Sequence, residues 1–253
     1  MIGALDLFPG LANVNQLPAP HLPETPWDAL GKLQRERVII DERTFLIDRP
    51  KESDQLLDHP VIRTAFAADE YMPYWADLWP ASRMLARAIL REDWPAGLMA
   101  LELGCGLGLP GIAALAKGLR VVFNDCDQTA LRFAAMNAKL NGFTNFELLP
   151  LDWRFPPKDI HFSLILGSDL VYERRHVDPL VVLIATVLAD DGLCLLTDQD
   201  RPPAEYLRHA LTANGLCFTS EMMRAGEPGG HRYKGTLYRI RHAARGHQST
   251  ASE

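Results

Sequence analysis

Residues 101–111 of this 253-residue chain read LELGCGLGLPG, and this stretch decides the fold. The apolar run 98–103 predicts a buried strand, and the run 112–117 predicts a helix. Glycines between a strand and a helix let the backbone pass close to a ligand, and the first turn of the helix offers free N–H groups. The stretch therefore predicts a strand, a ligand-binding turn and a helix in direct succession.

The second strand is predicted to end in an acidic residue. The apolar run 119–123 leads into Asn124-Asp125, and a carboxylate at that strand tip is where the hydroxyl pair of a ribose is held. A dinucleotide fingerprint needs its third glycine at position 109, where this chain has Leu109. The pattern is instead E-x-G-x-G-x-G, from Glu102 to Gly108, which argues against an NAD-dependent dehydrogenase.

Strands and helices alternate along most of the chain. Apolar runs predict seven strands, near 98–103, 119–123, 146–151, 162–167, 192–197, 216–222 and 233–241. Helices are predicted near 54–67 (interrupted by Pro60), 81–91, 110–117, 128–140, 177–189 and 203–213. This order predicts an α/β fold with a Rossmann-like, seven-stranded, mostly parallel sheet and helices on both faces. Because only a turn joins the last two strands, we expect them to form a C-terminal antiparallel β-hairpin.

Composition indicates an ordinary soluble globular protein, with 47% hydrophobic residues, 23% charged residues and a formal net charge of -6. No basic block suggests nucleic acid as a partner, and no apolar run is long enough to span a membrane. The four cysteines, Cys105, Cys126, Cys194 and Cys217, form no C-x-x-C pair, and no His cluster completes a zinc set, so no metal is expected. Isolated cysteines and the lack of a signal-peptide pattern predict a reducing, cytoplasmic location.

Two further strand ends carry polar and aromatic residues. After the third predicted strand, Asp152 could accept a hydrogen bond from an adenine amino group and Trp153 could stack near the ring; the alternative is an exposed turn. The fourth strand ends in the run Ser168-Asp169-Leu170-Val171-Tyr172. Ligands in such sheets lie beyond the carboxyl ends of the strands, so Asp169 and Tyr172 are candidates for the reacting side of the site. The alternative is that they are turn and rim residues.

These motifs together resemble the class I S-adenosylmethionine (SAM)-dependent methyltransferases, and among them the protein-lysine methyltransferase family 16. The resemblance rests on Trp79-Pro80 before the core, the E-x-G-x-G-x-G loop, the acid that ends strand two, D-W at 152–153 and D-x-x-Y at 169–172. The segments 73–80 and 124–127 are similar to the branch that methylates the electron-transfer flavoprotein β-subunit. The resemblance covers about residues 71–240.

The resemblance implies an enzyme that binds SAM. The residues that it implies for the cofactor are Trp79, Glu102, Gly104, Cys105, Gly106, Gly108, Asp125, Cys126, Asp152, Trp153 and Ser168. Asp125 is expected to hold the ribose hydroxyls, Asp152 and Trp153 the adenine, and Glu102 the amino-acid part from beneath. Trp79 is expected to lie against the cofactor.

The resemblance also implies a methyl acceptor, a lysine side chain of a protein substrate. Asp169 is expected to accept an N–H bond and fix the direction of the amine, and Tyr172 to narrow the channel. The aromatic residues Tyr71, Tyr74 and Trp75 either face the cationic groups or belong to the core. The run 174–176 is expected to be a solvated helix start.

Other interpretations remain open at this point. One is a small-molecule N-methyltransferase with a nicotinamide-like acceptor, which would need a lid, for example from residues 1–70. Another is a catalytically silent SAM-binding module. The predicted organisation is an N-terminal extension with a small β-hairpin (1–70), a methyltransferase domain (71–242) and a disordered tail (243–253). Nothing in the sequence sets the oligomeric state.

Overall fold

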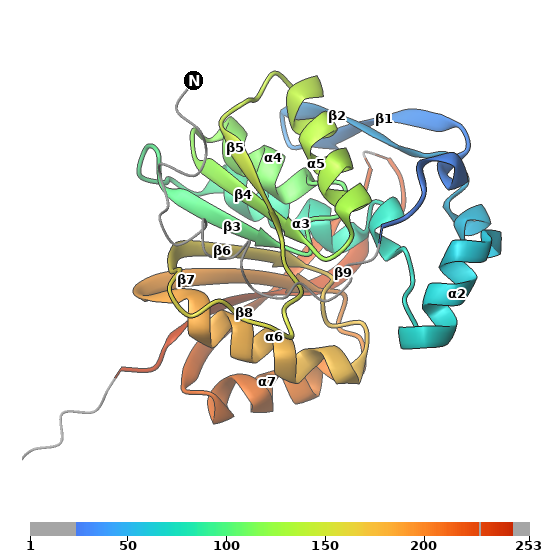
Figure 1. The fold of residues 1–253 in the computed structure, drawn as a ribbon. Coiled ribbons are helices and arrows are strands. Elements are labelled where there is room, and N and C mark those ends of the chain that lie inside the picture. The colour runs from blue at the N-terminus through green and yellow to red at the C-terminus, as the bar shows by residue number, and fades with distance from the viewer. Residues whose placement is uncertain (1–23, 228, 245–253) are drawn as a thin grey trace, which may run out of the picture.

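A seven-stranded sheet forms the centre of the molecule (Figure 1). Its strands are β3 (Met99–Leu103), β4 (Arg120–Asp125), β5 (Phe146–Pro150), β6 (Phe162–Ser168), β7 (Leu188–Asp198), β8 (Leu216–Ala225) and β9 (Tyr233–His242). They lie in the order β5-β4-β3-β6-β7-β9-β8. Strands β3 to β7 are parallel, and β9 runs antiparallel to both β7 and β8. The predicted mostly parallel sheet and its antiparallel C-terminal pair are confirmed.

The structure is a computed structural model that describes residues 24–227 and 229–244. Interpretations of residues 1–23, and of the tail from 245 to 253, lie outside the described residues. None of the described helices is both long and apolar enough to cross a bilayer.

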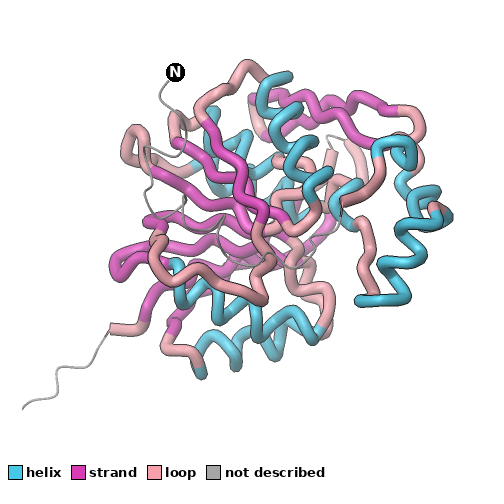
Figure 2. Tube along the Cα trace, in the orientation of Figure 1, coloured by secondary structure: helices cyan, strands magenta, loops and turns pink. Residues whose placement is uncertain are grey.

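Helices cover both faces of the sheet (Figure 2). They are α3 (Pro80–Arg91), α4 (Leu109–Ala116), α5 (Gln128–Leu140), α6 (Arg174–Val187) and α7 (Pro203–Ala213). The first three pack with one set of alternate strand residues, which includes Ala100 and Phe123. The last two pack with the other set, which includes Leu101 and Val122. Since successive side chains of a strand point to opposite faces, a sheet covered on both sides needs continuous apolar runs such as 98–103.

The N-terminal part of the described chain packs onto this core. Its elements are the 3-10 helix η2 (Trp27–Leu30), the antiparallel strands β1 (Leu33–Ile40) and β2 (Arg43–Pro50), the 3-10 helix η3 (Ser53–Asp58), α2 (Pro60–Asp69) and the 3-10 helix η4 (Tyr74–Ala76). Asn137 of α5 and Asn141, which caps the C-terminus of this helix, accept hydrogen bonds from backbone N–H groups of β2: Asn141 from Leu46 at 2.9 Å and Asn137 from Asp48 at 2.8 Å. These bonds fix the β1–β2 pair on α5.

Several element boundaries differ from the sequence prediction, and two of the differences are informative. Pro60 begins α2 rather than interrupting a helix, because its fixed φ suits the first helical turn. Strand β7 begins at Leu188, earlier than predicted, because Leu188 pairs with Phe162 across the sheet. Consequently α6 ends at Val187.

The register of the central strands brings the predicted site residues together. Leu103 of β3 pairs with Gly167 of β6, so the next residues, Gly104 and Ser168, lie at the same edge of the sheet. Asp125 ends β4, the next strand on the other side of β3. The strand order reverses between β3 and β6, and in open α/β sheets ligands bind in the crevice at such a point.

Candidate functional site

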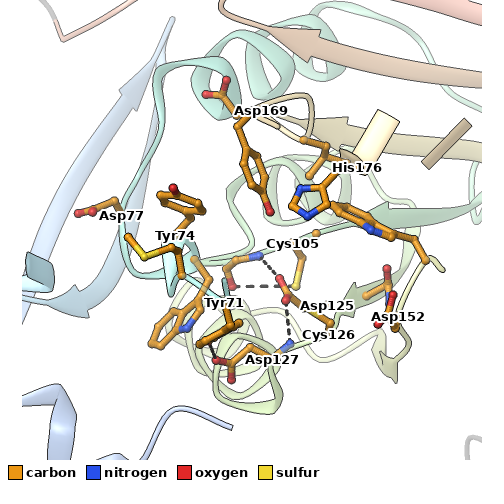
Figure 3. A pocket seen from close by; sticks show the side chains of 18 of the residues that line it. Tyr71, Tyr74, Asp77, Cys105, Asp125, Cys126, Asp127, Asp152, Asp169 and His176 are labelled. Carbon is orange, nitrogen blue, oxygen red and sulfur yellow. Dashed lines mark hydrogen bonds between the residues drawn. The ribbon is translucent and has the colours of Figure 1, made fainter. Parts of the chain in front are cut away.

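A cavity of about 1660 Å³ opens at the carboxyl ends of the parallel strands (Figure 3). It is larger than the roughly 300–1,000 Å³ that is usual for a small-molecule site, so it has room for more than one ligand group. The predicted site residues that line it are Trp79, Gly104, Cys105, Gly106, Gly108, Asp125, Cys126, Asp152, Trp153, Ser168, Asp169 and Tyr172. Of the predicted set, Glu102 is absent from the lining.

The glycine loop needs its glycines for two physical reasons. Gly104, Gly106 and Gly108 have φ angles of 53°, 50° and 83°, in the left-handed region that disfavours side chains. A Cβ on Gly104 would also lie 2.5 Å from Cδ2 of Leu170, and one on Gly108 would lie 3.0 Å from Cβ of Ala134. The loop is therefore a bare stretch of backbone along the cavity wall.

Glu102 lies beneath this loop rather than in the cavity. Its side chain is 2% exposed, and Oε2 accepts a hydrogen bond of 2.9 Å from the N–H of Gly111 in the first turn of α4. Burial raises its pKa well above the ordinary value. Through this hydrogen bond Glu102 holds the start of α4 against the glycine loop.

Asp125, at the end of β4, connects this strand to the glycine loop through a hydrogen bond. Its Oδ2 accepts a bond of 3.0 Å from the N–H of Gly106, and Oδ1 accepts one of 3.0 Å from the N–H of Asp127. Burial raises the pKa of Asp125 to about 6, and these backbone bonds partly oppose the shift. Burial also raises the pKa values of the Cys105 and Cys126 thiols, which keeps both protonated. The two cysteines therefore act as small apolar wall groups.

Asp127 is a residue that the site prediction missed. It caps α5 by accepting a 2.6 Å bond from the N–H of Thr129, and it accepts a 2.7 Å bond from the Thr25 hydroxyl. Tyr71 donates its phenol hydrogen to the same carboxylate. An Asp two positions before a Thr at a helix start was the available sequence signal for the cap, but no local pattern indicates Thr25 or Tyr71.

The carboxylate of Asp152 is held by a neighbouring residue. Arg154 donates to it from its backbone N–H at 2.9 Å and from Nε at 2.8 Å. The same guanidinium pairs with Asp69 of α2 at 3.0 Å. Next in sequence, Glu70 pairs with Arg175 of α6 at 2.7 Å. The segment that leaves α2 is therefore tied across the cavity to the loop after β5 and to the start of α6.

A continuous row of aromatic rings forms one wall of the cavity. Its members are Trp79, Tyr74, Tyr172, His176 and Trp153, with neighbouring ring centroids 6.1, 5.0, 5.0 and 5.7 Å apart. His176 therefore belongs to the site, and the expectation of a merely solvated helix start at 174–176 was wrong for this residue. Burial raises the pKa of Tyr172, so its phenol stays protonated, and burial lowers the pKa of His176.

The alternatives for the other aromatic residues are resolved by their positions. Trp75 is 7% exposed and packs on Phe133 of α5, with the ring centroids 5.1 Å apart, so it belongs to the core while also lining the cavity. Tyr74 packs edge-on against Tyr172 and lines the cavity. Tyr71 also lines it, with its hydroxyl turned to Asp127.

Asp169 stands at the other end of the cavity from Asp127 and Asp152 (Figure 3). Its φ of 58° is unusual for a residue with a side chain, and its N–H donates to the Thr197 carbonyl at 2.8 Å. The carboxylate is paired with Arg201 and accepts a 2.8 Å bond from Gln199. Burial raises its pKa, while the Arg201 charge and the Gln199 bond lower it.

A family model for lysine methyltransferases matches residues 73–209, more than half of the chain and most of the cavity wall. The chain belongs to the lysine methyltransferase family. The motif resemblance is thereby confirmed. The chain is 33% identical over 146 residues to the electron transfer flavoprotein beta subunit lysine methyltransferase of Mus musculus, covering 55% of this chain and 56% of the relative.

The protein of the same name from Danio rerio is 38% identical over 128 residues, covering 49% of this chain and 48% of the relative. The chain thus spans about half the length of the curated relatives it matches. Among solved structures, the ribosomal protein L11 methylase from Lactobacillus delbrueckii subsp. bulgaricus has a TM-score of 0.53 and 23% identity, covering 64% of this chain and 78% of that one. This likeness concerns the shared fold.

Proposed function

We propose that this chain transfers a methyl group from SAM to the side-chain amine of a lysine in a protein. The observation that carries the proposal is the two-part cavity of a lysine methyltransferase family member. One part combines the bare glycine loop with Asp125, and the other combines Asp169 with Tyr172. Its volume suits a nucleoside cofactor together with an acceptor side chain.

The residues of the first part fit SAM. A bare backbone at Gly104 and Gly106 admits the amino-acid part of the cofactor, and the buried carboxylate of Asp125 suits a pair of ribose hydroxyls. Asp152 and Trp153 line the opposite end, where an amino group and a flat ring can be held. Glu102 contributes from beneath, by fixing the loop rather than by touching the ligand.

When bound, SAM supplies an activated methyl group, which passes to the amine nitrogen while the sulfur keeps the bonding electron pair. The protein therefore has to align the amine and exclude water. Tyr172 and Tyr74 narrow the acceptor channel with apolar ring surface. Asp169 accepts an N–H bond from the amine and so fixes the direction of its lone pair. The acceptor lysine gives up one proton to water before the transfer, and the methylated amine keeps the positive charge that comes with the methyl group.

The main test measures methyl transfer and cofactor affinity in the same variant. Asp169→Asn is expected to lower turnover by about 10- to 1000-fold, the scale of a lost electrostatic contact in a transition state. SAM affinity, measured by calorimetry, should stay near that of the wild type, because the lost contact belongs to the acceptor. Asp190→Asn, at an exposed position at the opposite end of β7, is the control. Equal losses of turnover and SAM affinity would move Asp169 to the cofactor site.

A second candidate is methylation of a small molecule, such as a nicotinamide-like amine. This candidate is favoured by two ion pairs, Asp69–Arg154 and Glu70–Arg175, that hold the C-terminal end of α2 over the cavity. A segment held in this way can act as a lid. Labelled SAM is incubated with the protein and an extract of cells that lack this gene. A labelled protein band supports the main proposal, whereas label only in small molecules supports the second candidate.

A further inference from the structure

The acceptor side of the cavity presents a problem of charge. A lysine amine has a pKa of about 10.4 in water, so it is mostly protonated at neutral pH, and only the uncharged form has a lone pair for attack. A buried carboxylate favours the protonated form of a neighbouring amine. Asp169 alone would therefore hold the acceptor in its unreactive state, and a second group has to offset its charge.

Arg201 is placed where such a group is needed. It lies in the segment after β7 and lines the cavity, and its Nη2 is 3.2 Å from Oδ1 of Asp169. The guanidinium carbon lies 5.3 Å from the ring centroid of Trp79, and the backbone N–H donates to Asp198 at 3.1 Å. These contacts hold the cation beside the carboxylate that the acceptor has to meet.

The two oxygens of Asp169 are in different states. Oδ2 accepts the hydrogen bond from Gln199. Oδ1 is buried and accepts no hydrogen bond within the described part of the chain, although Arg201 faces it at ion-pair distance. Oδ1 is thus covered by a permanent positive charge, because arginine does not lose its proton in proteins. An amine that approaches the Asp169 carboxylate from the cavity therefore also comes close to that charge.

Resting on the proposed function, we infer that Arg201 makes the position beside Asp169 selective for the uncharged amine. Two cations that share one carboxylate repel each other, and burial keeps solvent from screening that repulsion. A neutral amine avoids the repulsion, so the acceptor leaves its proton in water before it enters. The methylated product is again a cation, and the same charge then favours its departure.

Other charged and titratable groups surround this pair. They are Asp198 at the end of β7, Asp200 in the segment after it, Glu205 and Arg208 on α7, Lys234 on β9, and Tyr172 on the aromatic wall. Burial raises the pKa of Asp198 to about 6, and burial keeps the Tyr172 phenol protonated by raising its pKa. Neither group therefore changes charge in the alkaline range where the amine titrates. Asp200, Glu205, Arg208 and Lys234 are exposed, so solvent screens their charges.

The test is the pH dependence of kcat with saturating SAM and a protein acceptor found in the extract experiment. Arg201→Gln and Arg201→Met should move the rising limb of kcat to higher pH by about one to two units, the scale of a neighbouring charge on a pKa. Arg201→Lys should return it toward the wild-type position. Arg208→Gln, an exposed arginine seven positions along the chain, is the matched control and should leave the profile unchanged.

Circular dichroism melting checks that the variants fold, and calorimetry should give SAM affinities within about threefold of the wild type, less than a 1 kcal/mol difference. Profiles that coincide for the wild type and both charge-removing variants would overturn the inference while leaving the proposed function intact. A wild-type protein that methylates no protein at all would reject the proposed function and this inference with it.

Discussion

Replacing Asp125 with asparagine should remove a pH-dependent loss of stability from the free protein and should weaken SAM binding. The Asp125 side chain is 8% exposed, and burial raises its pKa to about 6 in the folded state. The ordinary value in an unfolded chain is about 3.9. Between these two values the folded protein binds more protons than the unfolded chain does. This contribution to stability is therefore full below about pH 4 and is lost as the pH rises through 6.

The magnitude follows from the two pKa values. Integrating the difference in bound protons between the folded and unfolded states from pH 5 to pH 7.5 gives a decrease of about 1.4 kcal/mol in the free energy of unfolding of the wild type. The asparagine variant does not show this decrease, because asparagine does not ionise. The stability of Asp125→Asn relative to the wild type should rise by that amount over the same range. The variant has no charged carboxylate to hold the ribose hydroxyls, so SAM should bind about 5- to 150-fold more weakly, which is a loss of about 1–3 kcal/mol in binding free energy.

Urea denaturation at pH 5 and pH 7.5 measures the first effect, and calorimetry with SAM measures the second. Asp190→Asn, exposed on β7, controls for loss of a surface carboxylate. A stability difference that is the same at both pH values would show that the backbone bonds from Gly106 and Asp127 fully offset the cost of burying the charge. Unchanged SAM affinity would remove Asp125 from the cofactor site.

Two further substitutions test how the loop is supported. Gly104→Ala adds a Cβ at φ 53° and 2.5 Å from Leu170, so it should lower the free energy of unfolding by about 2–4 kcal/mol. Gly142→Ala adds a Cβ at φ 84° in open space, so it measures the backbone part of that loss alone, about 1–2 kcal/mol. Similar losses in urea denaturation would exclude the steric contact. Asn137→Ala removes bonds to Leu107 and to β2 and should lower stability by about 2–4 kcal/mol, whereas exposed Asn145→Ala should change it by less than about 0.5 kcal/mol. An equally small loss in Asn137→Ala would show that water replaces these bonds.

Local patterns were sufficient for the elements of the sheet and its helices. The observed α5 and α7, at 128–140 and 203–213, begin and end where the sequence predicts. Apolar runs bounded by glycine, asparagine and proline report burial and chain reversal at short range, which is what sets these boundaries. The boundary error at Leu188 arose because its strand pairing with Phe162 is a contact between distant residues.

The candidate site was predictable only in part. Residues that stand at strand ends, such as Asp125 and Asp169, could be found because the ends of parallel strands meet at one edge. Arg154 and Arg201 were missed. Arg154 has a local partner in Asp152, but its partner Asp69 lies 85 positions away in the chain, and Asp169, the partner of Arg201, lies 32 positions away.

The sequence by itself determined the α/β fold, the family and the side of the sheet on which the cavity lies. Hydrophobic periodicity and the glycine loop are written in neighbouring residues, so they can be read without the fold. Tertiary structure alone decided which side chains share the cavity: that Glu102 lies beneath the loop, that His176 joins the aromatic wall, and that Arg201 faces Asp169. Side-chain proximity between distant segments depends on how helices and loops pack on the sheet. That packing is set by the shape of the whole core rather than by any local run of residues.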